Sequence, residues 1–433
     1  MIRWAILGLI RDRTRSLFPF LVVTVGVSLT VALYGFMDGI GMSILDMTSK
    51  LDTGHIRVVN KPYYEEEHLI PIDRSLAGQR ETLDWLKKNG DSRITWSPRI
   101  RWMALMDVPD ENGETKSQTP VSGYALDMLN PDSPELERLE LEKSVVEGRL
   151  PTDSKELIVG YRLAENLDVG IGETVTLLGQ SFDGGMAMDN YTVVGFVKFG
   201  IAAMDQKMAL MDITGAQHTF YMEDMVTDWL GYLPASVSYQ EYPLIQQGLQ
   251  EKLPEWKMSP PASWASDDEP IVLSILDQRN LRPLVEKFEL ISGVNVMIFA
   301  FLMTLVLWNA GLINGVHRHG EMGLRLALGE THRDLVFRLA VEALVIGVAG
   351  SIAGCMVGGA FLYYLQEVGV DMGDAMAKSG MMLSDVARGR VSIEGLLWGG
   401  IPGIIASVFG TFIASLSVFK RSEASLFREL EVG

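Results

Sequence analysis

The sequence has very few residues that could form cross-links or hold a metal ion. Cys355 is the single cysteine among 433 residues, and there are six histidines. A lone cysteine excludes an intramolecular disulfide, so a domain outside the cytoplasm depends on its hydrophobic core alone. His317 and His319 are two residues apart, which places them on opposing sides of a helix, unlike the i, i+4 pair of a helical zinc site. We therefore predict no metal site.

Motifs for catalysis and a surface for nucleic acid are also missing. The sequence contains no GxxxxGK[ST] phosphate-binding loop and no GxSxG nucleophile elbow. Acidic residues outnumber basic ones by 55 to 37, a net charge of −18, whereas binding to nucleic-acid phosphates needs clustered Lys and Arg. We predict that the chain is not an enzyme, has no cofactor of its own and binds no nucleic acid.

What the sequence does contain is four long apolar runs with almost no charge. They are Leu17–Ile40, Leu290–Val316, Leu335–Leu365 and Gly395–Phe419. Each reaches the roughly 20 residues that span the hydrocarbon core of a bilayer. The first run is longer than the apolar region of a signal peptide and no A-x-A-like site follows it, so it is better explained as a span. We predict transmembrane helices over residues 17–40, 288–316, 335–365 and 395–419.

Basic residues close to the runs predict their orientation, because Lys and Arg next to a span favour the cytoplasmic side. Arginines precede the first run at positions 3, 11, 13 and 15, and further basic residues lie between the second and third runs and after the fourth. The cytoplasmic segments are then 1–16, 317–334 and 420–433. The long insert, residues 41–286, and the short loop 366–394 lie on the opposite side.

The long insert reads as a mixed α+β domain with an acidic surface. It carries 40 Asp and Glu against 22 Lys and Arg, which accounts for the whole negative charge of the chain. Strands are predicted in Gly54–Asn60 and Trp102–Val108, a hairpin turn at Asp110–Glu114 and a helix over Ser133–Ser144. Clear periodicity is lost from about residue 212 to 277, which predicts a second subdomain with its boundary near 212.

Methionines are frequent in the insert. We expect them to fill gaps in strands and loops, and the alternative is a copper site or a soft surface for acyl chains. The residues concerned are Met186, Met188, Met204, Met208 and Met211.

Two segments carry a recognisable pattern. The first is VVEGRLPTDSKELIVGYRLAENLDVGIGETVTL, residues 145–177, and the second begins HGEMGLRLALGE at residue 319. In this order along the chain they resemble FtsX-like permeases of the MacB type, the membrane subunits of mechanotransmitting ABC systems. Within that family, GHIRVVNKPYYEEE from residue 54 and VSGYALDMLN from residue 121 look most like the lipoprotein-releasing Lol permeases.

The resemblance implies an α-helical membrane protein of the bacterial inner membrane, with four transmembrane helices and a periplasmic MacB-like domain between the first two. ATP and Mg²⁺ would be bound by a separate cytoplasmic ABC ATPase dimer, and a second permease copy or homologue would complete the complex. The implied cargo is a lipoprotein, extracted from the outer leaflet and passed to a periplasmic carrier. The alternatives are tripartite efflux of small molecules or peptides through an adaptor, and a non-transporting FtsX-like regulator of a cell-wall hydrolase.

The resemblance also implies that residues 317–334 form a cytoplasmic coupling helix that docks on the ATPase. The core GEMGLRLALGE, residues 320–330, has the composition of a short amphipathic helix lying along the membrane. Its leucines and methionine supply apolar contacts, and the glycines near its two ends allow the chain to turn. The predicted ATPase-coupling residues are Glu321, Met322, Leu324, Arg325, Leu328 and Gly329.

Two charges lie within the third apolar run. Arg338 and Glu342 are four residues apart, so on a helix they can form an ion pair. Glu342 lies deeper in the run and must face protein or water, because a charge facing lipid is costly. We predict either a packing ion pair or a relay of movement from the coupling helix.

Small and amide residues in the runs predict contacts between helices. Gly350, Gly354 and Gly358 form a small-xxx-small stripe that allows a neighbouring helix to approach closely. Asn295 and Asn309, in the second run, are polar and require partners on other helices. These five residues are the remaining predicted intramembrane positions.

Overall fold

The computed structural model describes residues 13–110, 112–131, 133–255, 269–317, 324, 328–371 and 386–419. They divide into two compact units, which we describe separately. The membrane unit contains residues 13–42, 284–317, 328–371 and 386–419, and the insert domain contains the described part of residues 43–283. The chain passes between the units within its first helix and again near the start of its second long helix.

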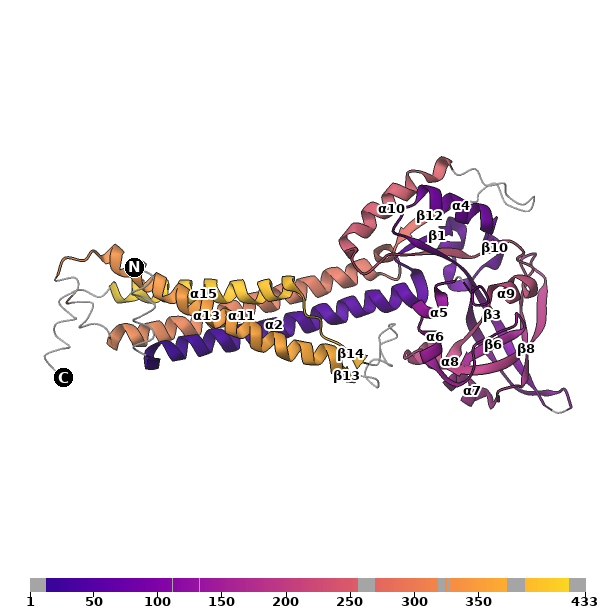
Figure 1. Cartoon of the computed structure of the whole chain (residues 1–433), viewed down its shortest axis with the longest axis horizontal. Helices are drawn as coiled ribbons and strands as arrows, with labels where there is room; N and C mark the ends of the chain where they lie inside the picture. The colour runs from indigo at the N-terminus through magenta and orange to yellow at the C-terminus, as the bar shows by residue number, and fades with distance from the viewer. Residues whose placement is uncertain are drawn as a thin grey trace. The chain divides into compact units, whose positions relative to one another are not determined.

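The membrane unit consists of four long helices that lie side by side (Figure 1). Each is long and apolar enough to cross a membrane, which confirms the four predicted spans. α2 has 36 residues, or about 54 Å at 1.5 Å per residue, so it exceeds the roughly 30 Å of the hydrocarbon core. The helices are α2 (Arg13–Thr48), α11 (Leu281–His317), α13 (His332–Val368) and α15 (Ile393–Phe419).

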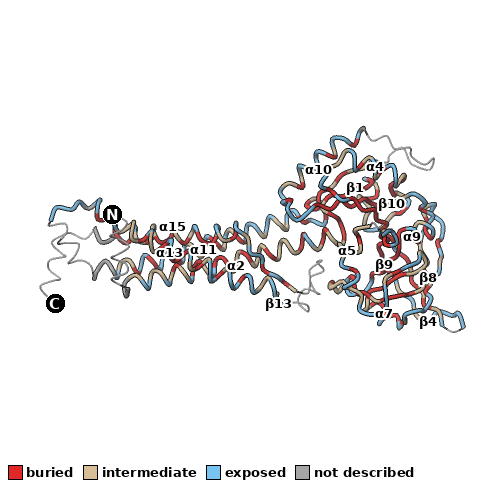
Figure 2. The backbone as a smooth tube through the Cα atoms, viewed as in Figure 1, coloured by how far each residue is buried: buried red, intermediate tan, exposed pale blue. Residues whose placement is uncertain are grey.

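Valine, methionine and leucine side chains fill the centre of the bundle. Val23, Val27 and Val31 of α2, spaced by four residues, are almost completely buried and pack against Met303 and Leu307 of α11. Exposed residues run along all four helices of the bundle (Figure 2). Many of them are large and apolar, such as Leu21, Phe301 and Ile405, which is what a lipid environment requires. The bundle is therefore buried at its centre and apolar all round.

Two short strands join α13 to α15 within the membrane unit. β13 (Val370–Asp371) pairs antiparallel with β14 (Val386–Ala387). The chain after β14 lies against α2, where the backbone N–H of Arg390 donates to the carbonyl oxygen of Gly35 at 2.9 Å. A Cβ at Gly39 would come within 2.3 Å of the carbonyl oxygen of Arg388, so the small residue permits this contact.

The insert domain is built on one ten-stranded, mostly antiparallel sheet, and mixed α/β structure between the first two spans confirms the predicted fold class. Only β4 with β9 and β6 with β8 pair in parallel within the described sheet. Its strands are β1 (Ile56–Asn60), β3 (Thr95–Pro109), β4 (Thr115–Leu126), β5 (Val145–Gly148), β6 (Glu156–Gly160), β7 (Thr174–Gln180), β8 (Met186–Val197), β9 (Met208–Asp212), β11 (Asp228–Tyr232) and β12 (Pro270–Ser274), and β2 (Leu76–Ala77) pairs separately with β10 (Met225–Val226).

Six of these strands close a ring. The pairings run β3–β4–β9–β6–β8–β7 and return to β3, because β7 pairs with both β3 and β8. Trp102 points into this ring and stacks on Phe220 with ring centroids 6.0 Å apart. A Cβ at Gly123 on β4 would lie 2.1 Å from the Trp102 ring, so only glycine leaves room for the indole. Ring closure also removes free strand edges.

The first half of β3 belongs to a second, open part of the sheet. There the order is β12–β1–β11–β3, with all neighbours antiparallel. Strands on both sides of residue 212 therefore share one sheet, and the sheet does not divide at the subdomain boundary expected near that residue. β3 is the strand that joins the ring to the open part.

Short helices cover the sheet. Their bounds are α3 (Lys61–Glu65), α4 (Gln79–Asn89), α5 (Glu135–Arg138), α6 (Leu141–Ser144), α7 (Tyr161–Leu167), α8 (Ala202–Lys207), α9 (Ile213–Thr219) and α10 (Tyr242–Gln250), with single turns at Glu67–Leu69, Ile72–Arg74, Tyr239–Glu241, Leu253–Glu255 and Ile275–Asp277. The π-helical turn η1 (Ser49–Thr53) follows α2 directly. The β3–β4 hairpin confirms the turn predicted at Asp110–Glu114.

The single helix predicted over Ser133–Ser144 is wrong. The structure has α5 and α6 instead, separated at Glu140, whose φ of 49° is left-handed and interrupts a right-handed helix. Propensity favoured one helix, but Leu141 packs into the core beside β6 and β8 from the second of the two short helices.

Candidate functional site

Most of the predicted coupling segment lies outside the described residues, including Glu321, Met322 and Arg325. Leu324 and Leu328 are described, and their side chains are 64% and 79% exposed. The backbone N–H of Leu328 donates to the carbonyl oxygen of Leu324 at 3.0 Å, so the two side chains are one helical turn apart. They form an exposed apolar pair.

α13 begins at His332, within the last three residues of this segment. Gly329 has a φ of 93°, a conformation that favours glycine. Thr331 then caps α13, accepting a hydrogen bond from the backbone N–H of Asp334 and donating one to its carboxylate at 2.6 Å. The turn and cap fix where the segment ends and the third span starts.

The glycine stripe of α13 packs directly on α2. A Cβ at Gly350 would lie 2.9 Å from the Cβ of Val23, and one at Gly354 would lie 2.7 Å from the carbonyl oxygen of Thr24. At Gly358 the nearest atom is the carbonyl oxygen of Ser28, at 2.6 Å. All three glycines are thus used for close approach of helices within this chain.

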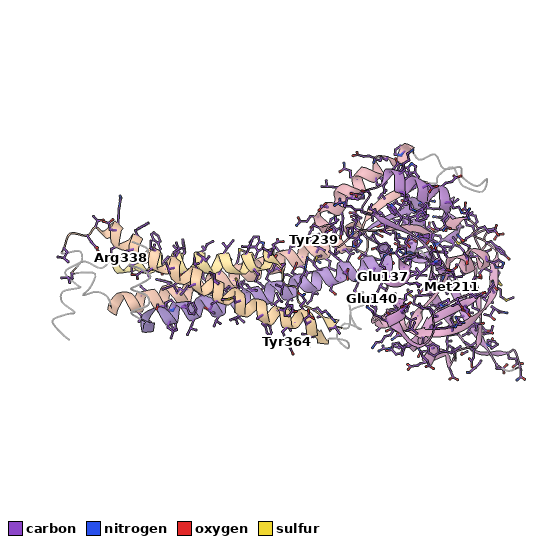
Figure 3. All side chains as sticks on the ribbon, in the orientation of Figure 1. Glu137, Glu140, Met211, Tyr239, Arg338 and Tyr364 are labelled. Atoms are coloured by element: carbon purple, nitrogen blue, oxygen red, sulfur yellow. The ribbon has the colours of Figure 1, made fainter. Side chains whose placement is uncertain are left out.

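The polar residues predicted to lie within the membrane differ in their exposure. Figure 3 places Arg338 toward the end of the bundle where α13 begins, and its side chain is exposed, while Glu342 is half-buried. The ion pair between them stays a prediction. On α11, Asn295 is half-buried and Asn309 is exposed in this single chain. The structure therefore brings the three glycines of α13 onto one neighbour, α2, whereas the two asparagines belong to another helix, α11.

The methionines of the insert domain fall into two groups. Met204, Met208 and Met211 are buried in its core, as gap-filling predicts. Met186 and Met188 on β8 are 79% and 67% exposed. Among the described residues no group of His, Cys, Asp or Glu is arranged to hold a metal ion.

A buried charge cluster, which the motif analysis did not find, lies in the open part of the sheet. Arg101 on β3 donates to the side chain of Asp52 in η1 and, through Nη2, to Asp228 on β11 at 3.1 Å. Arg57 on the neighbouring strand β1 donates to Asp228 at 3.1 Å. We call this group the Asp52 cluster; it is formed by Asp52, Arg57, Glu67, Arg101, Asp228 and Arg279. The positive charges of its three arginines equal the negative charges of its three carboxylates.

A second buried carboxylate lies beside this cluster. Glu135 in α5 is fully buried and accepts hydrogen bonds from Ser97, Arg99 and Arg138. Arg99 also donates to the backbone carbonyl of Leu51 at 2.9 Å. Two arginines of β3 therefore hold η1, Arg99 through Leu51 and Arg101 through Asp52.

At the centre of the Asp52 cluster, Asp228 and Arg101 favour their charged forms. Burial alone would raise the pKa of Asp228, but the positive charges of Arg101 and Arg57 outweigh burial and hold that pKa below its ordinary value. Burial likewise acts to lower the pKa of Arg101, yet Asp228 and Asp52 raise it well above its ordinary value. The cluster is a set of true ion pairs, with each charge compensated.

Comparison with known families gives two matches. Residues 17–239 match the MacB-like periplasmic core domain, and residues 294–422 match the FtsX-like permease C-terminal region. The first match covers more than half of the chain. No curated protein matches the chain.

Among solved structures, the chain is similar to the crystal structure of the periplasmic region of MacB from Actinobacillus actinomycetemcomitans. The two are 11% identical, with a TM-score of 0.34. The match covers 53% of this chain and 92% of that one.

Proposed function

The chain belongs to the family that carries the MacB-like periplasmic core domain, and on that basis we propose that it is a permease subunit that releases lipoproteins from the bacterial inner membrane. ATP would be hydrolysed on a separate cytoplasmic ABC ATPase dimer. The movement of the membrane helices would then drive the periplasmic domain to extract the cargo from the outer leaflet. A second permease copy or homologue and a periplasmic carrier complete the scheme.

The packing of the membrane unit carries this proposal. Its buried polar side chains, among the described residues, are all hydroxyls, and no buried charge occurs there. A path for a polar substrate needs polar or charged groups that line it. A bundle closed by Gly350, Gly354 and Gly358 against α2 is better suited to transmitting movement than to conducting a substrate.

The exposed pair Leu324 and Leu328 supports docking of an ATPase at the coupling segment. Large apolar side chains exposed on the polar side of a membrane protein are typical of an interaction site. Together with Arg325 between them in sequence, they offer an apolar contact and a positive charge to a groove in the partner.

Efflux of small molecules or peptides is the second candidate, because the family match is to a MacB-like domain and is shared by both functions. The two candidates differ in their partners, a soluble lipoprotein carrier for release and an adaptor with an outer-membrane duct for efflux. A regulator of a cell-wall hydrolase is disfavoured by the large insert, which exceeds the small external domains of FtsX-like regulators.

The proposal is tested by purifying the full chain from native membranes and identifying the subunits and lipid-linked proteins bound to it. We expect an ABC ATPase and a triacylated lipoprotein. The purified complex, in proteoliposomes, should release that lipoprotein into solution when ATP is added. Recovery of a membrane-fusion adaptor without release would favour efflux, and recovery of no ATPase would contradict both transport functions.

Charge reversal tests the coupling segment within this proposal. Arg325→Glu should abolish assembly with the ATPase or lower lipoprotein release per ATP at least about tenfold, as expected when a docked charge loses its partner. Lys87→Glu, a reversal at an exposed position of α4 in the insert domain, is the control and should change neither quantity. Normal release by the Arg325→Glu complex would remove this residue from the coupling interface.

A further inference from the structure

Asp52 connects three parts of the insert domain that are far apart in the sequence. It lies in η1, which continues from α2, and its side chain is fully buried. Its carboxylate accepts hydrogen bonds from Arg101 on β3, from the hydroxyl of Tyr124 on β4 at 3.0 Å, and from Nε of Arg279 at 3.0 Å. Arg279 lies two residues before α11. The chain that follows α2 and the chain that leads into α11 thus meet at one carboxylate.

The chain around Arg279 has an unusual backbone. Arg279 and Asn280 have φ values of 50° and 55°, so two successive residues other than glycine are left-handed. Such conformations are unfavourable for residues with a Cβ and persist where surrounding contacts enforce them. Those contacts are the ion pair of Arg279 with Asp52 and the buried side chain of Gln278, which accepts a hydrogen bond from Arg57 at 3.1 Å.

The pair between Asp52 and Arg279 contributes position more than stability. The Arg279 side chain is 49% exposed, and exposed partners add little to the stability of a fold. Asp52 is already compensated by Arg101 and bound by Tyr124. What Arg279 adds is a fixed connection between the segment before α11 and the segment after α2.

We propose that Asp52, Arg101 and Arg279 form a joint that locks η1 and the segment 278–281 to β3, so that a movement of α2 or α11 is passed to the sheet without slippage. This role rests on the proposed transport function. The three are positioning residues: Arg101 anchors the joint in the sheet, Asp52 is its centre, and Arg279 joins the α11 side.

Arg279→Gln tests the joint, because it removes the ion pairs of Arg279 with Asp52 and Glu67 and leaves Asp52 paired with Arg101. Arg282→Gln is a matched control: the Arg282 side chain is 46% exposed and pairs at 2.6 Å with Asp277, only five residues away in the chain. In proteoliposomes with the co-purified ATPase and a fluorescent triacylated lipoprotein, Arg279→Gln should lower lipoprotein release per ATP by about fivefold or more, at an unchanged melting temperature. Arg282→Gln should match the wild type, and Arg279→Lys should restore part of the loss.

Hydrogen exchange on the full chain in lipid nanodiscs, without any ATPase, tests the joint independently of transport. Arg279→Gln should speed amide exchange in residues 49–54 and 278–281, and Arg282→Gln should not. Unchanged exchange at 49–54 would overturn the joint. Faster exchange with normal release per ATP would overturn its transmitting role. If the wild type releases no lipoprotein, the proposed function fails, and the exchange result still supports or overturns the joint.

Discussion

The membrane unit and the insert domain achieve tight packing by opposite means. In the membrane unit, glycines bring helix backbones into contact, and its buried polar side chains, where the structure describes them, are hydroxyls. In the insert domain, three arginines, Arg57, Arg99 and Arg101, are buried in the sheet with carboxylate partners. Close contact between helix backbones stabilises the membrane unit, and buried ion pairs stabilise the insert domain. Different substitutions should therefore destabilise the two units.

The largest expected effect is loss of a buried charge in the insert domain. Arg101→Met leaves Asp52 and Asp228 buried with fewer positive partners, which should lower the free energy of unfolding by about 3–5 kcal/mol. Lys61→Gln removes the exposed pair with Glu269 and should cost less than about 1 kcal/mol. Denaturant unfolding, monitored by hydrogen exchange in each unit, measures the free energy of unfolding of both variants. A small effect of Arg101→Met would show that apolar packing alone holds the open part of the sheet.

A smaller effect is expected in the membrane unit, from two neighbouring glycines. Gly358→Ala puts a methyl group against the backbone of Ser28, which forces α13 away from α2 and should cost about 1–3 kcal/mol. Gly359→Ala meets only Leu396 at an ordinary 3.7 Å and should be neutral or stabilising. Thermal unfolding in detergent compares the two variants. Equal melting temperatures would contradict backbone contact as the basis of bundle packing.

The last expected effect is a pH dependence of the stability of the insert domain. Burial lowers the pKa of His55 to about 4, from an ordinary value of 6.5. Between these values the unfolded chain binds the proton and the folded domain does not, so the stability of the domain should fall as pH falls from about 6.5 to about 4. His55→Gln retains an acceptor for the N–H of Leu233 and should weaken this dependence. Identical pH profiles for the two proteins would contradict a neutral, buried His55.

Composition predicted the membrane unit well because a span needs only length and a lack of charge. The four apolar runs correspond to α2, α11, α13 and α15, although the helices extend beyond the hydrocarbon core, where composition no longer marks them. The glycine stripe could be read from its spacing of four, but its partner could not, since any helix face can receive a stripe of small residues. The structure was needed to identify α2.

The insert domain was harder to predict because its order depends on contacts distant in sequence. Arg99 and Arg101 resemble surface charges in a strand, and nothing near them identifies Glu135, Asp52 or Asp228 as partners. Strand β11 is buried along its whole length, so it lacks the alternation that marks a strand with one exposed face. The signal that could have indicated the cluster is two arginines spaced by two within an apolar strand.

The position of β1 has a consequence for the biogenesis of the protein. β1 pairs with β11 on one side and with β12 on the other, and both are synthesised long after it. While the insert is being exported, Ile56, Val58 and Val59 have neither neighbouring strand available, although all three are fully buried in the finished domain. The open part of the sheet is therefore completed only after β12 has been synthesised, whereas the ring contains neither β1 nor its two partners. Until then β1 is an unpaired strand edge, open to a holding chaperone or to aggregation.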